Sequence, residues 1–134
     1  MINFFQQNIS VNSSHLDQMN HVNNVVYLQW VQDVSEAHWM AVATPHILEK
    51  YYWVALRHEI DYKSQAYLGD ELLVKTHLKE YGGVRSKRAV QIYRKADNQL
   101  IMESLTTWIL MSASTNKPTR ISEEMIQLFP LITS

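Results

Sequence analysis

The sequence predicts an α+β fold in which one long helix packs against an antiparallel sheet. Apolar residues recur at helical spacing over a single long segment, residues 24–42. From residue 51 to residue 111, four segments follow one another in which apolar and polar residues alternate, and short turns join them. Strands joined in this way pair antiparallel, whereas a parallel sheet would need more helices.

The first half of the chain is predicted as a strand and two helices. Residues 2–11 have the alternation of a strand. The helix at 24–42 has a broad apolar stripe, formed by Tyr27, Trp30, Val31, Val34, Ala37, His38 and Ala41. Thr44 followed by Pro45 is typical of a helix start, so residues 46–50 are predicted as a short helix.

The second half is predicted as four strands and a short helix. The strand beginning at Tyr51 is expected to place Val54, Leu56, His58, Ile60 and Tyr62 on one face, and Arg57, Glu59 and Asp61 on the other. The next strands are predicted at 72–80, 84–95 and 100–111. Ser122 is predicted to cap a helix that ends near Pro130.

Length and composition narrow the class of protein. The 134 residues are predicted to form one domain, 1–134, and the absence of cysteine excludes disulfides, a thiolate nucleophile and a cysteine zinc site. A net charge of -1 gives no general attraction to nucleic acid. The N-terminus lacks the pattern of a signal peptide, and no apolar run approaches the length of a membrane span. A cytoplasmic protein without a membrane partner is therefore expected.

The candidate chemistry lies just before the long helix. Asp17 precedes a helix start whose first amides, around Asn24 and Val25, have no acceptor within the helix. Such a terminus favours developing negative charge, and a carboxylate can attack a carbonyl or take a proton from an attacking water. A thioester suits so sparse a site because its leaving thiolate, with a parent pKa of about 8.5, hardly needs a general acid.

These residues resemble the hotdog-fold acyl thioesterases. The pattern is Asp17-x-x-Asn20-His21-Val22-Asn23-Asn24-x-x-Tyr27, with Trp30, Glu59–Tyr62 and Leu68–Asp70 downstream. It is most similar to the 4-hydroxybenzoyl-CoA thioesterase branch, and the Leu-Asp and His-Val-Asn-Asn runs are similar to plant acyl-carrier-protein thioesterases. The resemblance implies a five- or six-stranded antiparallel sheet wrapped around one central helix, and a homodimer or tetramer with active sites at the dimer interface. It also implies Asp17 as the catalytic carboxylate and the Asn24 amide as the oxyanion donor.

The sequence departs from the family pattern in two places. Asn20 stands where glycine is usual, and asparagine is one of the few other residues that tolerate a left-handed backbone. Met19 stands where the plant-type pattern has asparagine, so that residue's role cannot be transferred. A further branch uses a Glu on the long helix, a part that Asp33 or Glu36 can take here.

Four residues are candidates for a supporting or substrate-contacting role, and each has a simpler structural interpretation. His21 is expected to brace the turn by hydrogen bonding, and Asn23 to start the helix. Tyr27 can line an acyl pocket, but core packing is favoured for it, as for Trp30, Val34 and Met40. Glu59 can act as a second carboxylate, although a solvated charged face is favoured.

Two basic clusters are candidates for binding the phosphates of coenzyme A. They comprise Arg85, Lys87 and Arg88 beside the Gly82–Gly83 turn, and Lys117 with Arg120 after the last strand. Strand alternation cannot place Arg85 and Arg88 on the same face, so at most part of the cluster contacts one ligand, and a solvated patch is the alternative. No cofactor is predicted, and the six histidines lack the spacing of a metal site.

The sequence therefore favours an acyl-CoA thioesterase, with an acyl-carrier-protein thioester as the other possible substrate. One alternative is a non-catalytic protein that binds acyl thioesters. A second is an enoyl-thioester hydratase on the same fold, which is disfavoured because Asp17 and His21 are four residues apart with no proline between them.

Overall fold

The computed structural model describes residues 4–132 and confirms the α+β hotdog architecture. Its elements are β1 (Phe5–Ser10), the 3₁₀ turn η1 (Ser13–His15), α1 (Asn24–Val42), α2 (Pro45–Lys50), β2 (Tyr51–Tyr62), β3 (Glu71–Gly82), β4 (Arg85–Arg94), β5 (Gln99–Ser112) and α3 (Glu123–Leu128). All helices and strands predicted from the sequence are present, with boundaries shifted by a few residues. Residues 2 and 3 of the predicted first strand lie outside the described residues.

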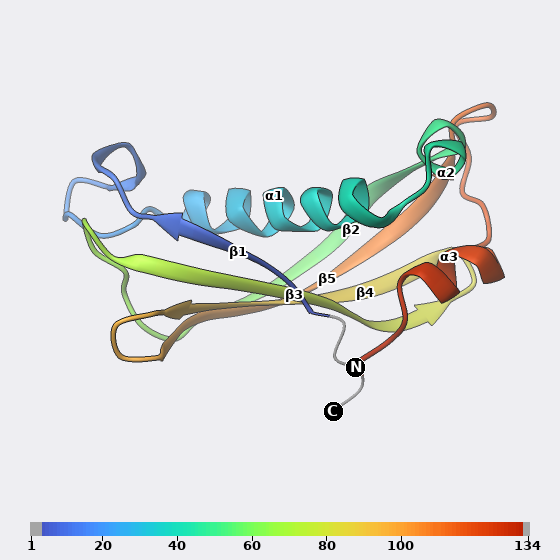
Figure 1. Cartoon of the computed structure of the whole chain (residues 1–134). Coiled ribbons are helices and arrows are strands. Elements are labelled where there is room, and N and C mark those ends of the chain that lie inside the picture. Colours follow the sequence, from blue (N-terminus) through green and yellow to red (C-terminus); the bar gives the residue numbers. More distant parts are fainter. Residues whose placement is uncertain (1–3, 133–134) are drawn as a thin grey trace.

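The sheet has five strands in the order β1-β3-β4-β5-β2, and all its pairs are antiparallel. Strands β3, β4 and β5 are joined by short turns, while β1 and β2 form opposite edges. The segment between β1 and β2 contains α1, which runs along one face of the twisted sheet and packs mainly on β1 and β3 (Figure 1). The N-terminal end of α1 therefore follows the loop that leaves β1, and its C-terminal end leads through α2 into β2.

The helix starts are stabilised by side-chain caps of the expected kind. Asn23 caps α1 by accepting a hydrogen bond from the Val25 amide at 3.1 Å. Thr44 and Ser122 cap α2 and α3 in the same way, each accepting from an amide three residues later. These caps satisfy amides that would otherwise have no partner, so the predicted starts of all three helices are confirmed.

Strand β2 corrects one expectation about which residues share a face. The pairing of β2 with β5 shifts between Ala55 and Arg57, which leaves Leu56 as the extra residue of a β-bulge. The bulge reverses the alternation, so Val54 and Leu56 are exposed while His58 and Ile60 are half-buried. The prediction that Val54 and Leu56 would share a face with His58, Ile60 and Tyr62 was therefore wrong, because one unpaired residue exchanges the two faces of a strand.

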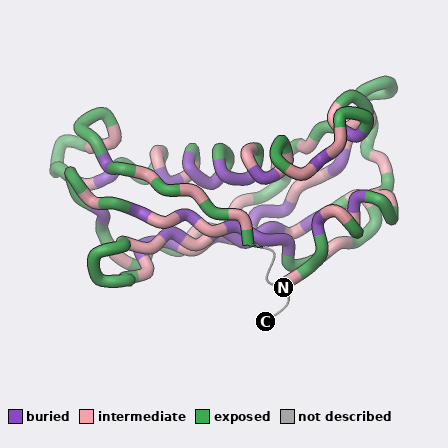
Figure 2. The backbone as a smooth tube through the Cα atoms, in the orientation of Figure 1, coloured by how far each residue is buried: buried purple, intermediate pink, exposed green. Residues whose placement is uncertain are grey.

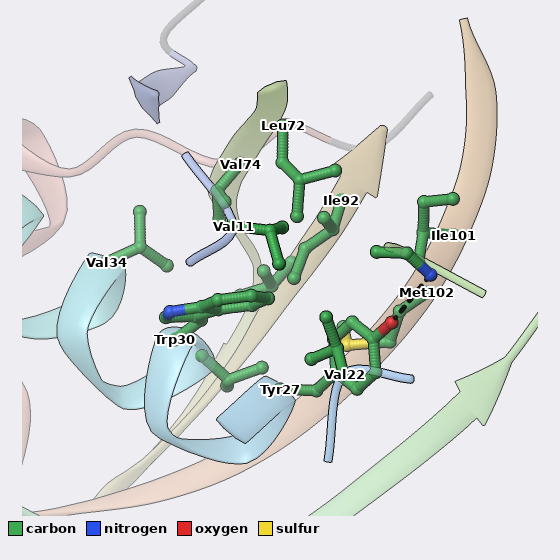
Figure 3. Close-up of a cluster of buried hydrophobic side chains, with 13 residues drawn as sticks. Val11, Val22, Tyr27, Trp30, Val34, Leu72, Val74, Ile92, Ile101 and Met102 are labelled. Carbon is green, nitrogen blue, oxygen red and sulfur yellow. Dashed lines mark hydrogen bonds between the residues drawn. The ribbon is translucent and has the colours of Figure 1, made fainter. Parts of the chain in front are cut away.

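The main core lies between the first half of α1 and the inner face of the sheet. Figure 2 shows the buried stripe of α1 facing the sheet, and Figure 3 shows Tyr27, Trp30 and Val34 packed among strand residues. The prediction that Tyr27, Trp30 and Val34 are core residues is confirmed, but Met40 is 57% exposed. Core packing was therefore the wrong prediction for Met40.

A smaller cluster joins the other end of α1 to α2, α3 and the sheet, and it includes Ile47, Leu110, Met125 and Phe129. Among residues 4–132, no helix is long and apolar enough to cross a membrane.

Candidate functional site

Asp17 lies in a tight, exposed turn that its own backbone and side chain help to build. Its amide donates to the His21 carbonyl at 2.8 Å, and Leu16 and Val22 pair across the turn as an isolated β-bridge. One carboxylate oxygen, Oδ1, accepts from the amides of Met19 at 2.9 Å and His21 at 3.1 Å. The other oxygen, Oδ2, accepts from no residue in the described part of the chain. Asp17 is therefore held in place by one oxygen while the second stays available for chemistry.

Asn20 gives this turn its unusual backbone conformation. Its φ is 61°, in the left-handed region that costs other L-residues about 1–2 kcal/mol, and its amide donates to the Asp17 carbonyl at 3.2 Å. The prediction that Asn20 tolerates a left-handed conformation in this turn is therefore confirmed.

Changing Asn20 separates the backbone requirement from any role of its side chain. We expect Asn20→Gly to keep thioester turnover within about twofold, because glycine adopts positive φ freely. Asn20→Val should lower the free energy of unfolding by about 1–3 kcal/mol and reduce turnover, because a β-branched residue is strained there. Turnover and urea unfolding of the two variants measure this, and equal behaviour of Gly and Val would contradict it.

The start of α1 leaves one amide without a partner beside this turn. The Val25 amide donates to the Asn23 side chain, and the Val26 amide donates to the Asn23 carbonyl at 2.9 Å. The Asn24 amide has no acceptor among residues 4–132. Both amides were expected to lack an acceptor. In the structure this holds for Asn24, whereas the Val25 amide donates to the capping side chain of Asn23.

The residues predicted to support the site or to contact substrate have different surroundings in the structure. The backbone amide of His21 binds Asp17, while its ring packs edge-on against Tyr67 with centroids 5.7 Å apart. Tyr27 is buried, and its hydroxyl accepts from the Ala66 amide at 3.2 Å, so it holds the strand-connecting loop against the helix. The pKa of the Tyr27 hydroxyl is raised, mainly because the side chain is buried.

Glu59 is exposed on β2 and pairs with Arg57 at 3.3 Å on the expected charged face. The two alternative acids on α1 are also at the surface, and Asp33 accepts from Gln29 at 2.8 Å. None of these carboxylates hydrogen-bonds or pairs with Asp17 in the described chain. Among these acids, Asp17 is the one in the loop that leads into α1, seven residues before Asn24.

The predicted CoA-binding residues lie toward the far end of α1 from Asp17. Lys117 and Arg120 are exposed in the loop that joins β5 to α3, near α2 (Figure 1). Arg85 is exposed at the start of β4, and Lys87 pairs with Glu80 at 3.8 Å. Within one chain the structure does not bring this basic group to the Asp17 turn, because the length of α1, about 28 Å, separates them.

Arg88 is not a surface residue, which corrects its assignment to the CoA-binding cluster. It is 6% exposed on the inner face of β4, where Nη1 contacts His38 Nδ1 at 2.8 Å and donates to Thr76 Oγ1 at 3.0 Å. The alternation of side chains along a strand correctly predicted that Arg85 and Arg88 lie on opposite faces of β4. It did not predict that Arg88 is the one on the inner face.

A cavity of about 520 Å³ lies beside Arg88, between the second half of α1, the start of β2, the inner sheet face and α3. The cavity was not predicted from the sequence, because it arises from the packing of α1 on β1 and β3 rather than on β2. At 1.5 Å per residue, the level of His38 is about 20 Å along α1 from Asn24. This cavity is thus separate from the Asp17 turn. Metal-binding groups of three or more His, Cys, Asp or Glu are absent from residues 4–132.

His38 makes the stability of the fold sensitive to acid. Burial, with a smaller contribution from the Arg88 charge, lowers its pKa from 6.5 to about 4. Between about pH 6.5 and pH 4 the unfolded chain binds more protons than the folded chain, so stability falls as the pH is lowered. The loss attributable to His38 is on the order of 3 kcal/mol over this window. Burial also lowers the pKa of His58 and of His77, which adds in the same direction.

Urea unfolding at a series of pH values measures this effect. His38→Gln should flatten the decline between about pH 6.5 and pH 5, where few carboxylates titrate, while its amide oxygen can still accept from Arg88. An unchanged slope in that variant would contradict the assignment to His38.

Comparison with known proteins places the chain among thioesterases. The family model of the acyl-ACP thioesterase N-terminal domain matches residues 3–129. The long-chain acyl-CoA thioesterase FadM of Escherichia coli is 25% identical over 128 residues, covering 90% of this chain and 92% of FadM. Among solved structures, the probable thioesterase YbaW of Escherichia coli superposes with a TM-score of 0.79 at 23% identity, covering 92% and 94% of the two chains. A Staphylococcus aureus protein solved in complex with CoA superposes with a TM-score of 0.82 at 18% identity, covering 98% of this chain and 89% of that one.

Proposed function

The chain belongs to the acyl-ACP thioesterase family, and from this we propose that it hydrolyses acyl-CoA thioesters at the Asp17 turn. Thioester hydrolysis is the activity of this family, and FadM, which aligns over nearly the full length of both chains, is a long-chain acyl-CoA thioesterase. The observation that supports the residue assignment is that the loop entering α1 carries both a free carboxylate oxygen, on Asp17, and an amide without an acceptor, that of Asn24.

The proposed reaction begins with the thioester carbonyl oxygen at the Asn24 amide. That amide, at the positive end of α1, stabilises the oxyanion as the carbonyl carbon becomes tetrahedral. Oδ2 of Asp17 either attacks the carbon, giving an anhydride that water then cleaves, or takes a proton from the attacking water. The two amides on Oδ1 keep the carboxylate oriented in either route. Collapse of the tetrahedral intermediate breaks the carbon–sulfur bond and releases the thiolate.

The proposed carrier is coenzyme A, bound through the exposed basic residues. The four that remain candidates once Arg88 is removed are Arg85, Lys87, Lys117 and Arg120. Because α1 separates them from Asp17 within one chain, we expect them to serve the Asp17 turn of a second copy in a homodimer. The choice of CoA as carrier is supported by FadM, which is a long-chain acyl-CoA thioesterase.

The basic residues can be tested through the nucleotide part of the substrate. We expect Lys117→Gln and Arg120→Gln each to raise the KM for an acyl-CoA by about two- to fivefold, as exposed charge pairs are weak. The KM for the matching acyl-pantetheine, which lacks the nucleotide phosphates, should not change. Thr119→Ala, in the same loop, serves as the control, because the Thr119 side chain makes no hydrogen bond within the described chain. A rise with both substrates would contradict a phosphate contact.

Release of free thiol from a panel of short, long and aromatic acyl-CoAs tests the proposed function directly. We expect at least one class to be cleaved, with the free acid and CoA as products. If the chain binds acyl-CoA without releasing thiol, it is a binding protein and the proposal fails.

A further inference from the structure

Arg88 is a buried cation without a carboxylate partner. It is 6% exposed, and the ion pairs of the described chain all involve other residues. Its two hydrogen-bond partners, His38 and Thr76, offer no negative charge, since a threonine hydroxyl is uncharged and a histidine ring is never anionic near pH 7. The lowered pKa of His38 also keeps that ring from adding a second positive charge. Nε and Nη2 donate to no residue among 4–132.

Such an arrangement is costly unless something else supplies the missing charge. A buried ion without a counterion loses its hydration and gains no Coulomb attraction in return. Burial lowers the pKa of Arg88 to about 10, so the guanidinium still carries its charge near neutral pH. The fold thus maintains a positive charge and free donors in its interior.

The free side of Arg88 borders the 520 Å³ cavity, whose volume is typical of small-molecule sites. The rest of its wall is largely aromatic and aliphatic, with Trp39, Trp53, Leu78 and Phe129 among the lining residues. A ligand that fills it must therefore have an apolar body as well as a group that satisfies Arg88.

A second observation points to the same ligand chemistry. Trp108 also lines the cavity, and its indole N–H is buried with no acceptor among the described residues. Arg and Trp side chains are donors only, so Arg88 and Trp108 offer a ligand hydrogen bonds and positive charge. Glu36, at the edge of the cavity, is exposed and forms no ion pair with Arg88. The missing group should be an anion with acceptor oxygens.

We propose that this cavity binds a carboxylate carried on an apolar body, such as a fatty or aryl acid, with Arg88 as its charge partner. The planar guanidinium fork matches the two oxygens of a carboxylate. A ketone or hydroxyl would accept hydrogen bonds but leave the buried charge uncompensated. A phosphate monoester carries close to two negative charges near pH 7, which a single guanidinium would not balance within a largely apolar wall.

Calorimetric titration of the full chain with decanoate and with decanol tests the charge requirement. These probes have the same chain length and differ in the head group, and neither is a thioester, so the result does not depend on turnover. We expect decanoate to bind at least about tenfold more tightly than decanol, the difference that a charge-assisted hydrogen bond provides. Equal affinity for the two probes would overturn the proposal.

A variant at Arg88 and a control at another cation locate the effect. Arg88→Met should abolish the preference for decanoate and leave decanol binding unchanged, and Lys95→Met, at an exposed residue just after β4, should keep the preference. Because the proposed role is binding, Arg88→Met should be at least as heat-stable as the parent chain. If Arg88→Met does not fold, Arg88→Lys, which keeps the charge and loses the fork, should bind decanoate several-fold more weakly. A preference that survives these changes at Arg88 would overturn the proposal.

The carboxylate can come from the acid that hydrolysis releases or from the far end of an acyl group. A lower KM for decanedioyl-CoA than for decanoyl-CoA, erased by Arg88→Met, would identify the acyl end as the source. Equal KM values together with tight decanoate binding would identify the released acid. Either result retains a carboxylate site at Arg88.

Discussion

Replacing Asp17 with asparagine is expected to lower kcat for acyl-CoA hydrolysis by about 10²- to 10⁴-fold, the usual contribution of a general base or nucleophile. The fold and the turn should remain, because the side-chain oxygen of asparagine can still accept from the amides of Met19 and His21. The amide group cannot take a proton from water or attack the carbonyl carbon. Free-thiol release and urea unfolding of Asp17→Asn measure the two parts of this expectation.

Two further variants make the Asp17 result specific. Asp33→Asn, at an exposed carboxylate on α1, should keep turnover within about twofold. Asp17→Ala should lose turnover and also stability, because two amides lose their acceptor. If Asp17→Asn hydrolyses acyl-CoA as fast as the parent chain, Asp17 is not the reacting group. In that case Glu36, on the neighbouring helix, becomes the acid to test.

Truncating Trp30 is expected to produce the largest loss of stability, about 3–5 kcal/mol for Trp30→Ala. Trp30 is 6% exposed, and its ring lies among the strand residues of the main core (Figure 3). It also packs edge-on against Tyr27 and against His15, with centroids 5.5 and 5.1 Å apart. His15 accepts from Asn12 and its carbonyl accepts from the Asn23 amide, so the loop that carries Asp17 rests partly on this ring.

The loss in Trp30→Ala should therefore extend to catalysis. Turnover per folded molecule should fall as well as the urea midpoint, since the loop before α1 loses its support. Met40→Ala, ten residues along the same helix, should change stability by less than about 0.5 kcal/mol because Met40 is exposed. A similar loss in both variants would mean that α1 contributes uniformly rather than through its buried stripe.

The fold was predictable because its signals are local. The stripe that includes Tyr27 and Val34 repeats at helical spacing, and Asn23, Thr44 and Ser122 mark helix starts within one turn. The left-handed turn at Asn20 was predictable for the same reason, since few residues other than glycine adopt that conformation. The proximity of Asp17 to the start of α1 follows from their closeness in the sequence.

The features that were not predictable depend on contacts between distant segments. The bulge at Leu56 arises from how β2 pairs with β5, and it reversed the expected faces of half a strand. Alternation showed that Arg85 and Arg88 lie on opposite faces, but the inner face is decided by where α1 packs. The cavity beside Arg88 depends on the packing of α1 on β1 and β3, which no periodicity records.

The placement of β1 and β2 at opposite edges of the sheet has a consequence for folding kinetics. Strands β3, β4 and β5 can pair through short turns, whereas Ser10 must find Glu71, 61 residues away, and Tyr51 must find Ser112. Closing such long loops costs entropy before contacts repay it, so the central hairpins should form first and the two edges should dock late. Under native conditions, amide hydrogens at these edges should exchange before those of β4, and the Asp17 loop, attached to β1, should open with its edge.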